Sequence, residues 1–124
     1  GLRVQIETNG TLWLPLPDDP RLTIVCSPKT PKLHPETSKR IHSMKYVVKC
    51  GEQSEEDGLP VVSTQLEGQS AELARPGPDH QIYLMPLDEQ DPELNRQNLE
   101  ACVKTCLEYG YRLTVQGHKT WGVP

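Results

Sequence analysis

The sequence is short of aromatic and apolar residues. Among its 124 residues there is no phenylalanine, only 5% are aromatic and 35% are hydrophobic, whereas prolines number twelve. Apolar burial per residue is therefore poorer than in an average compact domain, which a thin core or a missing half of a domain would explain equally well. The length suits one domain with one core and excludes two.

Targeting and membrane signals are also lacking. No apolar run approaches the roughly 20 residues of a membrane span. The N-terminus lacks the basic and apolar pattern of a signal peptide. A formal net charge of −4 provides no field to attract a nucleic-acid backbone. We therefore predict a cytoplasmic protein that neither enters a membrane nor binds nucleic acid.

Cysteines are too few and too widely spaced for a secreted disulfide framework. The four are Cys26, Cys50, Cys102 and Cys106. Each sits singly in an apolar stretch, which predicts reduced thiols. Cys102 and Cys106 lie four residues apart on one helix face, but no second pair or histidine nearby completes a four-ligand set. The favoured interpretation is a pair of buried structural cysteines and not a metal site.

Five short segments have the β-branched and apolar composition of strands. They are Val4 to Glu7, Leu22 to Cys26, Met44 to Val48, Ile82 to Leu84 and Tyr111 to Gln116. Several are nearly continuous apolar runs, which is typical of a parallel sheet buried on both faces. The sequence thus predicts an α/β fold with a mostly parallel sheet.

The strongest helical pattern runs from Pro92 to Tyr109, where apolar residues recur at spacings of three and four. Asp91 suits the N-cap, Pro92 the first turn and Gly110 the C-terminal cap. This helix and the strands before and after it predict one βαβ unit.

Two other segments give weaker signals. Residues 35–42 have the pattern of a short helix. Residues 51–81 combine an acidic run with several glycines and prolines, which predicts a solvated, loop-rich insertion in which only Val61 to Ala74 has helical character.

Polar segments follow the predicted strands, where parallel α/β sheets bind ligands. They are Glu7 to Thr11, Ser27 to Lys29, Met85 to Asp88 and Gln116 to Lys119. The first is also the pattern of an Asn-Gly turn that ends a strand.

His118, beside Gln116 and Lys119, suits either proton exchange with a substrate or an exposed turn. His34, His42 and His80 fall in predicted loops without zinc-site spacing.

Taken in order, these segments resemble the 7-carboxy-7-deazaguanine synthase family of radical S-adenosylmethionine (SAM) enzymes. The matching stretches are Glu7 to Thr11, Ser27 to Lys29, Lys45 to Val48, Leu84 to Asp88, Gln116 to Lys119 and Gly122 to Pro124. They spread over nearly the whole chain. The resemblance implies that residues 1–124 form the C-terminal part of one radical SAM domain, a partial (β/α) barrel.

The resemblance also implies a reaction. Enzymes of this family are carbon–nitrogen lyases that contract the ring of 6-carboxy-5,6,7,8-tetrahydropterin to 7-carboxy-7-deazaguanine. They use S-adenosyl-L-methionine, a [4Fe-4S] iron–sulfur cluster and Mg²⁺. The product serves the biosynthesis of queuosine and related 7-deazapurines, and so tRNA modification. A homodimer and a small-molecule pterin substrate are the partners expected.

Carried over by position, two strand-end segments belong to the SAM site and the chain end belongs to the pterin site. The SAM-binding residues are Ser27, Pro28, Lys29, Met85, Pro86, Leu87 and Asp88. The pterin-binding residues are His118, Gln116 and the terminal carboxylate of Pro124, which can accept two hydrogen bonds from an aminopyrimidinone.

Three departures from the family pattern keep alternatives open. Met85 stands where the family has glutamine, and Gly117 where it has threonine. The family's three-cysteine cluster motif is missing, so the ligands of the cluster and of Mg²⁺ are expected outside this chain, which alone would be inactive. The alternatives are a related radical enzyme with another substrate, and a non-catalytic α/β binding or interaction domain.

Overall fold

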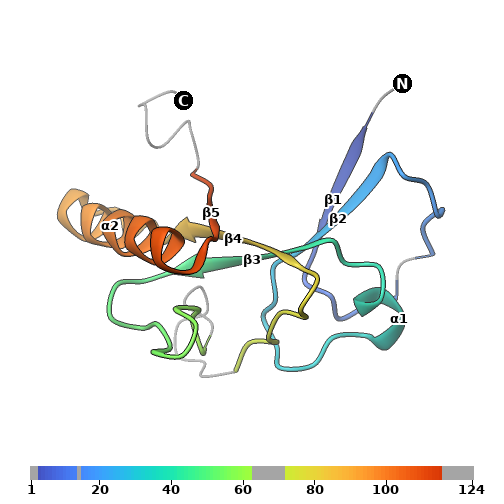
Figure 1. Cartoon of the computed structure of the whole chain (residues 1–124), viewed down its shortest axis with the longest axis horizontal. Helices are drawn as coiled ribbons and strands as arrows, with labels where there is room; N and C mark the ends of the chain where they lie inside the picture. The colour runs from blue at the N-terminus through green and yellow to red at the C-terminus, as the bar shows by residue number, and fades with distance from the viewer. Residues whose placement is uncertain (1–2, 14, 63–71, 116–124) are drawn as a thin grey trace.

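A computed structural model describes residues 3–13, 15–62 and 72–115 of the chain (Figure 1). Its strands are β1 (Val4–Thr8), β2 (Leu22–Cys26), β3 (Ser43–Val48), β4 (Gln81–Pro86) and β5 (Arg112–Leu113). Its helices are α1 (Pro35–Ser38) and α2 (Pro92–Tyr109). The strands form one sheet in the order β1-β2-β3-β4-β5, and every neighbouring pair is parallel. The predicted parallel α/β fold is confirmed.

The five strands and the helices α1 and α2 lie where they were predicted, and β1, β3 and β4 are one to three residues longer than predicted. β5 comprises Arg112–Leu113 and is shorter than the predicted strand. α1 ends at Ser38, four residues before the predicted end at His42. The reason is local. The Arg40 N–H donates a hydrogen bond to the Thr37 carbonyl at 3.0 Å, which forms a turn after the helix, and β3 begins soon afterwards at Ser43.

The caps of α2 are those that the sequence predicts. The Asp91 side chain accepts hydrogen bonds from the backbone N–H groups of Glu93 and Leu94, at 2.9 and 3.1 Å. At the other end Gly110 adopts a φ of 77° and donates its N–H to the Cys106 carbonyl. Among the described helices, none has the length and apolar character needed to cross a membrane.

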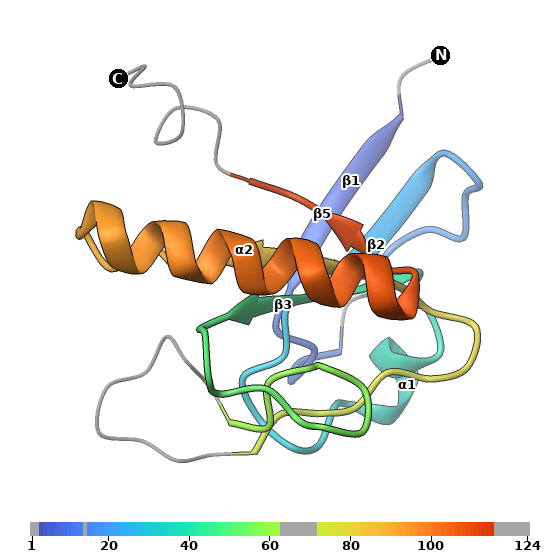
Figure 2. The ribbon, with the colours of Figure 1, turned by 60° about the vertical axis from the view of Figure 1, so that its left-hand side comes forward.

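The hydrophobic core lies on the face of the sheet that α2 covers (Figure 2). Alternate residues of the central strands point to this face. The buried cluster consists of Ile24, Cys26, Ile41, Met44, Tyr46, Val48, Leu59, Leu73, Leu84 and Cys102. Of the strands, only β3 is buried along nearly its whole length, so the expectation of a sheet buried on both faces is wrong for the outer strands. Within the described residues, α2 and the insertion between β3 and β4 both pack on this face of the sheet.

The insertion between β3 and β4 is only partly the solvated excursion that was predicted, since its acidic run is largely exposed but other parts pack on the core. Leu59 is fully buried, Leu73 and Ala74 are buried, and the Tyr46 hydroxyl donates to the Ala74 carbonyl at 2.7 Å. Val62 pairs with Glu72 in an antiparallel bridge, so the described ends of the predicted helix at 61–74 are extended. A core without phenylalanine needs cover beyond one helix, and this segment supplies it.

All four cysteines are free thiols. Cys102 is fully buried in the core, as predicted for the pair Cys102 and Cys106, whereas Cys106 is only half-buried. Cys26 is also fully buried in the core. Cys50 departs from the expectation of an apolar setting, because it is exposed in the turn after β3.

Burial of the core thiols predicts a loss of stability in alkali. It raises the pKa of Cys26 to about 11 and that of Cys102 to about 12, above the ordinary 9.0. The folded state therefore holds these protons more tightly, and its advantage is complete below the ordinary thiol pKa and lost as the pH rises towards the folded values. The urea concentration at the unfolding midpoint is therefore expected to fall as the pH rises above the ordinary thiol pKa of 9.0. Cys50→Ser should leave this fall unchanged, whereas Cys102→Ala should reduce it.

Candidate functional site

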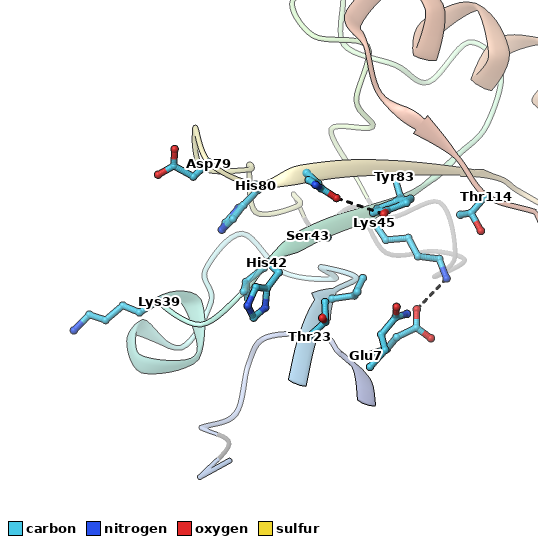
Figure 3. A pocket seen from close by; sticks show the side chains of 14 residues that line it. Glu7, Thr23, Lys39, His42, Ser43, Lys45, Asp79, His80, Tyr83 and Thr114 are labelled. Atoms are coloured by element: carbon cyan, nitrogen blue, oxygen red, sulfur yellow. Dashed lines mark hydrogen bonds and ion pairs between the residues drawn. The ribbon is translucent and has the colours of Figure 1, made fainter. Parts of the chain in front are cut away.

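A hollow of about 760 Å³ lies on the sheet face opposite the core (Figure 3). We call it the open face. Its polar lining includes Glu7, Thr23, Ser43, Lys45, Tyr83 and Thr114. In the central strands β2, β3 and β4 these positions alternate with the core residues, because successive side chains of a strand point to opposite faces. One face of the sheet is thus built for packing and the other for polar contacts.

An ion pair spans the open face. Lys45 Nζ on β3 lies 3.0 Å from Glu7 Oε1 on β1, across the intervening strand β2. The Lys45 side chain is 22% exposed, whereas that of Glu7 is 53% exposed. A pair as exposed as this contributes only about 0–1 kcal/mol to stability. Its chemical value is that an ammonium and a carboxylate stand side by side and can bind a polar ring edge that both donates and accepts hydrogen bonds.

The segment from Glu7 to Thr11 ends strand β1 and then turns. This agrees with the predicted Asn-Gly turn at a strand end. Asn9 Oδ1 accepts hydrogen bonds from the Thr11 N–H at 3.0 Å and from the Thr11 hydroxyl at 2.8 Å. Gly10 is buried with a φ of 80°, a conformation that favours glycine. Within this segment it is Glu7 that reaches the open face.

The predicted SAM-binding segments lie at the carboxyl end of the sheet. Ser27 follows β2, and its N–H donates to the Thr8 carbonyl at the end of β1 at 2.8 Å, while Pro28 is buried. Met85 and Pro86 end β4, and the Leu87 N–H donates to the Val48 carbonyl of β3 at 2.9 Å.

The two segments therefore share one edge of the sheet, with β3 between their strands. Their binding role stays a prediction.

Asp88 already has a structural role. Its Oδ1 accepts hydrogen bonds from the Gln90 N–H and from Asn95 Nδ2, both at 2.9 Å. These bonds hold the loop between β4 and α2, in which Gln90 has a φ of 56°. The Asp88 carboxylate therefore holds the backbone of this loop in place.

The predicted pterin-binding residues, Gln116, His118 and Pro124, lie outside the described residues. Sequence reasoning passed over Tyr83 and Thr114 on the open face, and it set aside His42 and His80, which also line the hollow. The period-two placement of Tyr83 along β4 was a usable signal, but which face remains open is known only from the tertiary structure.

Within the described part of the chain, no three histidine, cysteine or acidic side chains converge as a metal site requires. These residues do not fit an iron–sulfur cluster or a magnesium ion. We therefore assign no step through either group to this chain.

The chain matches two curated proteins, but no protein-family model and no solved structure. It is 48% identical over 124 residues to the 7-carboxy-7-deazaguanine synthase of Rhodospirillum rubrum. The aligned region covers 96% of this chain and 53% of that protein. It is 36% identical over 126 residues to the 7-carboxy-7-deazaguanine synthase of Rickettsia prowazekii. That aligned region covers 98% of this chain and 48% of that protein. The resemblance read from the strand-end segments is thereby confirmed. Over nearly its whole length, the chain is similar to about half of a 7-carboxy-7-deazaguanine synthase.

Proposed function

We propose that the chain is the C-terminal part of a 7-carboxy-7-deazaguanine synthase. The whole protein would convert 6-carboxy-5,6,7,8-tetrahydropterin to 7-carboxy-7-deazaguanine, in the biosynthesis of queuosine and related 7-deazapurines. The observation that carries this proposal is the 48% identity over 96% of the chain. Because the chain spans about half the length of the relatives it matches, it would supply part of the site and no turnover of its own.

The sheet geometry supports this proposal. All strands are parallel, and two segments assigned to SAM by resemblance lie at the carboxyl edge, where ligands of such sheets bind. The open face leads from that edge along the strands and carries the Glu7–Lys45 pair. In this proposal Ser27 and the backbone of residues 85–88 bind SAM, and the open face receives the pterin.

The cofactors of the proposed reaction are SAM, a [4Fe-4S] cluster and Mg²⁺. The reduced cluster and SAM would supply the 5′-deoxyadenosyl radical that removes hydrogen from the substrate, and Mg²⁺ would assist the ring contraction. The residues of this chain would bind and orient the substrate. The Glu7 carboxylate can accept hydrogen bonds from N–H groups at one edge of the pterin ring, and the Lys45 ammonium beside it can donate to an acceptor of the same edge.

The proposal is tested with the whole-length protein from the same reading frame. After anaerobic reconstitution with iron and sulfide, we expect it to release 5′-deoxyadenosine from SAM and to form 7-carboxy-7-deazaguanine, both measured by mass spectrometry. Release of 5′-deoxyadenosine without that product would identify a related radical enzyme with another substrate. If neither compound forms, the non-catalytic alternative holds.

Lys45→Met in the whole-length protein tests the open face. We expect kcat/KM for the pterin to fall about 100-fold, because a charge contact to the reacting molecule is lost. Lys104→Met is the matched control, since Lys104 is an exposed lysine of α2, away from the open face. Equal kcat/KM values for the two variants would exclude Lys45 from the site. Retention of the protein's unfolding midpoint separates a binding effect from a folding defect.

A further inference from the structure

Two histidines stand together at the amino-terminal end of the open face, away from the segments assigned to SAM (Figure 3). His42 directly precedes β3 and His80 directly precedes β4. The two strands are parallel, with Ser43 opposite Gln81, and the Gln81 N–H donates to the His42 carbonyl at 3.2 Å. The two histidines therefore occupy neighbouring positions at the start of adjacent strands.

Backbone contacts fix the protonation pattern of both rings. His42 Nδ1 accepts a hydrogen bond from the Ile24 N–H at 3.0 Å, and His80 Nδ1 accepts one from the Gly77 N–H at 2.9 Å. A ring nitrogen that accepts carries no hydrogen, so the hydrogen of each neutral ring is on Nε2. Both rings thus have a hydrogen-bond donor left over. This tautomer disfavours a metal, which would need a bare Nε2.

The surroundings add more groups that can donate. Thr23 and Ser43 line the same hollow, and their hydroxyls have no hydrogen-bond partner among the described residues. Figure 3 shows the side chains of Lys39 and Asp79 directed away from the two rings. Lys39 pairs with Glu36 at 3.3 Å. The donors directed toward the rings in this view are therefore neutral, although the charged Lys39 and Asp79 also line the hollow.

We propose that this end of the open face binds a phosphate group through His42 Nε2 and His80 Nε2, with the hydroxyls of Ser43 and Thr23 as further donors. A phosphate has only acceptor oxygens at its surface and can accept from several directions at once. The proposal is independent of the proposed function, because no step of that function uses either histidine.

The binding is measured by long-range proton–nitrogen NMR spectra of the histidine side chains. Inorganic phosphate is titrated into the chain at neutral pH, with sodium chloride keeping the ionic strength constant. We expect the Nε2 signals of His42 and His80 to shift along one saturating curve in the millimolar range.

His34 is the internal control, because its Nδ1 likewise accepts a backbone N–H, that of Glu36 at 3.2 Å, although it does not line this hollow. A shift of equal size at His34, or the absence of saturation, overturns the proposal.

Methyl phosphate in a parallel titration separates two sources of the ligand. Binding of both compounds points to an esterified phosphate as a natural ligand, whereas binding of inorganic phosphate alone points to the free ion. Acetate at the same ionic strength checks that the response belongs to phosphate. If acetate gives the same curve as phosphate, the assignment to phosphate is wrong.

Two kinds of variant separate binding from folding. In His42→Asn and His80→Asn, the amide oxygen can still accept the backbone N–H, but the donor at the Nε2 position is lost. We expect each to weaken phosphate binding about tenfold, with an unchanged unfolding midpoint. His42→Gln and His80→Gln keep an amide N–H near the Nε2 position and should retain most of the affinity. Wild-type affinity in the double asparagine variant would overturn the proposal.

Discussion

Replacing Asn98 with alanine is expected to lower the free energy of unfolding by about 3 kcal/mol. Asn98 is 2% exposed, and its side chain makes three hydrogen bonds from α2 to the carboxyl end of the sheet. Its Oδ1 accepts from the Cys50 N–H at 2.8 Å, and its Nδ2 donates to the Leu87 carbonyl and to Glu89 Oε2, both at 2.9 Å. Alanine leaves these partly buried polar groups without their partner, which costs more than the bonds themselves.

Gln97→Ala is the matched control for this prediction. Gln97 precedes Asn98 on the same helix, but its side chain donates only to the exposed Glu93, at 3.2 Å. Its loss is expected to change stability by less than about 0.5 kcal/mol. The check is urea unfolding of the two variants with the m-value compared, and equal midpoints would mean that the Asn98 contacts do not stabilise the fold.

The same substitution bears on the proposed site. Asn98 holds the Leu87 carbonyl, and Leu87 belongs to the segment assigned to SAM by resemblance. In the whole-length protein, Asn98→Ala should therefore raise the KM for SAM more than that for the pterin. Asn98→Asp also loses the donors to Leu87 and Glu89 but keeps an acceptor for the Cys50 N–H, so a rise in the KM for SAM that both variants share is assigned to the lost donors and not to the Cys50 contact.

Gly58→Ala is expected to destabilise the chain by about 3 kcal/mol. Gly58 is buried with a φ of 73°, a conformation that L side chains rarely adopt. An added Cβ would lie 2.4 Å from Thr105 Cγ2 and 3.0 Å from Tyr109 Cε2, both on α2. The Thr105 side chain cannot simply move away, because its hydroxyl accepts a hydrogen bond from Gln53 Nε2 at 2.7 Å.

Gly51→Ala separates backbone strain from steric overlap. Gly51 has a φ of 88°, but no atom lies within 4 Å of an added Cβ. Its substitution should cost about 1 kcal/mol, from the backbone conformation alone. The difference between the two variants, measured by urea or thermal unfolding, is then the cost of forcing the insertion away from α2. A loss at Gly58 no larger than that at Gly51 would show that the contact between insertion and helix is loose.

Local patterns found most of the framework. The stripe of α2, the cap at Asp91 and the glycine at its end are properties of neighbouring residues, and α2 begins and ends where they indicate. The strands were found for the same reason, since β-branched and apolar runs reflect burial of the segment itself. The short β5 shows the limit of this reasoning, because strand length at an edge depends on the pairing with β4 and not on composition.

The insertion between β3 and β4 illustrates what local patterns miss. Its acidic and glycine-rich composition suggested a solvated loop, but Leu59, Leu73 and Ala74 complete the core. Burial of such scattered apolar residues is decided by where the chain returns to the sheet, which no local period encodes. The segment is anchored by the Tyr46 and Tyr111 hydroxyls, which donate to the Ala74 and Asp57 carbonyls at 2.7 Å.

By itself the sequence determined the parallel α/β class, the bounds of α2, the structural thiols of the core and the likeness to the deazaguanine synthases, because each depends on the order and spacing of residues along the chain. The tertiary structure decided which face of the sheet stays open. It joined Glu7 to Lys45 across β2 and brought His42 beside His80, 38 positions apart in the printed sequence. Such contacts follow from strand order and register, and those depend on how the whole chain packs.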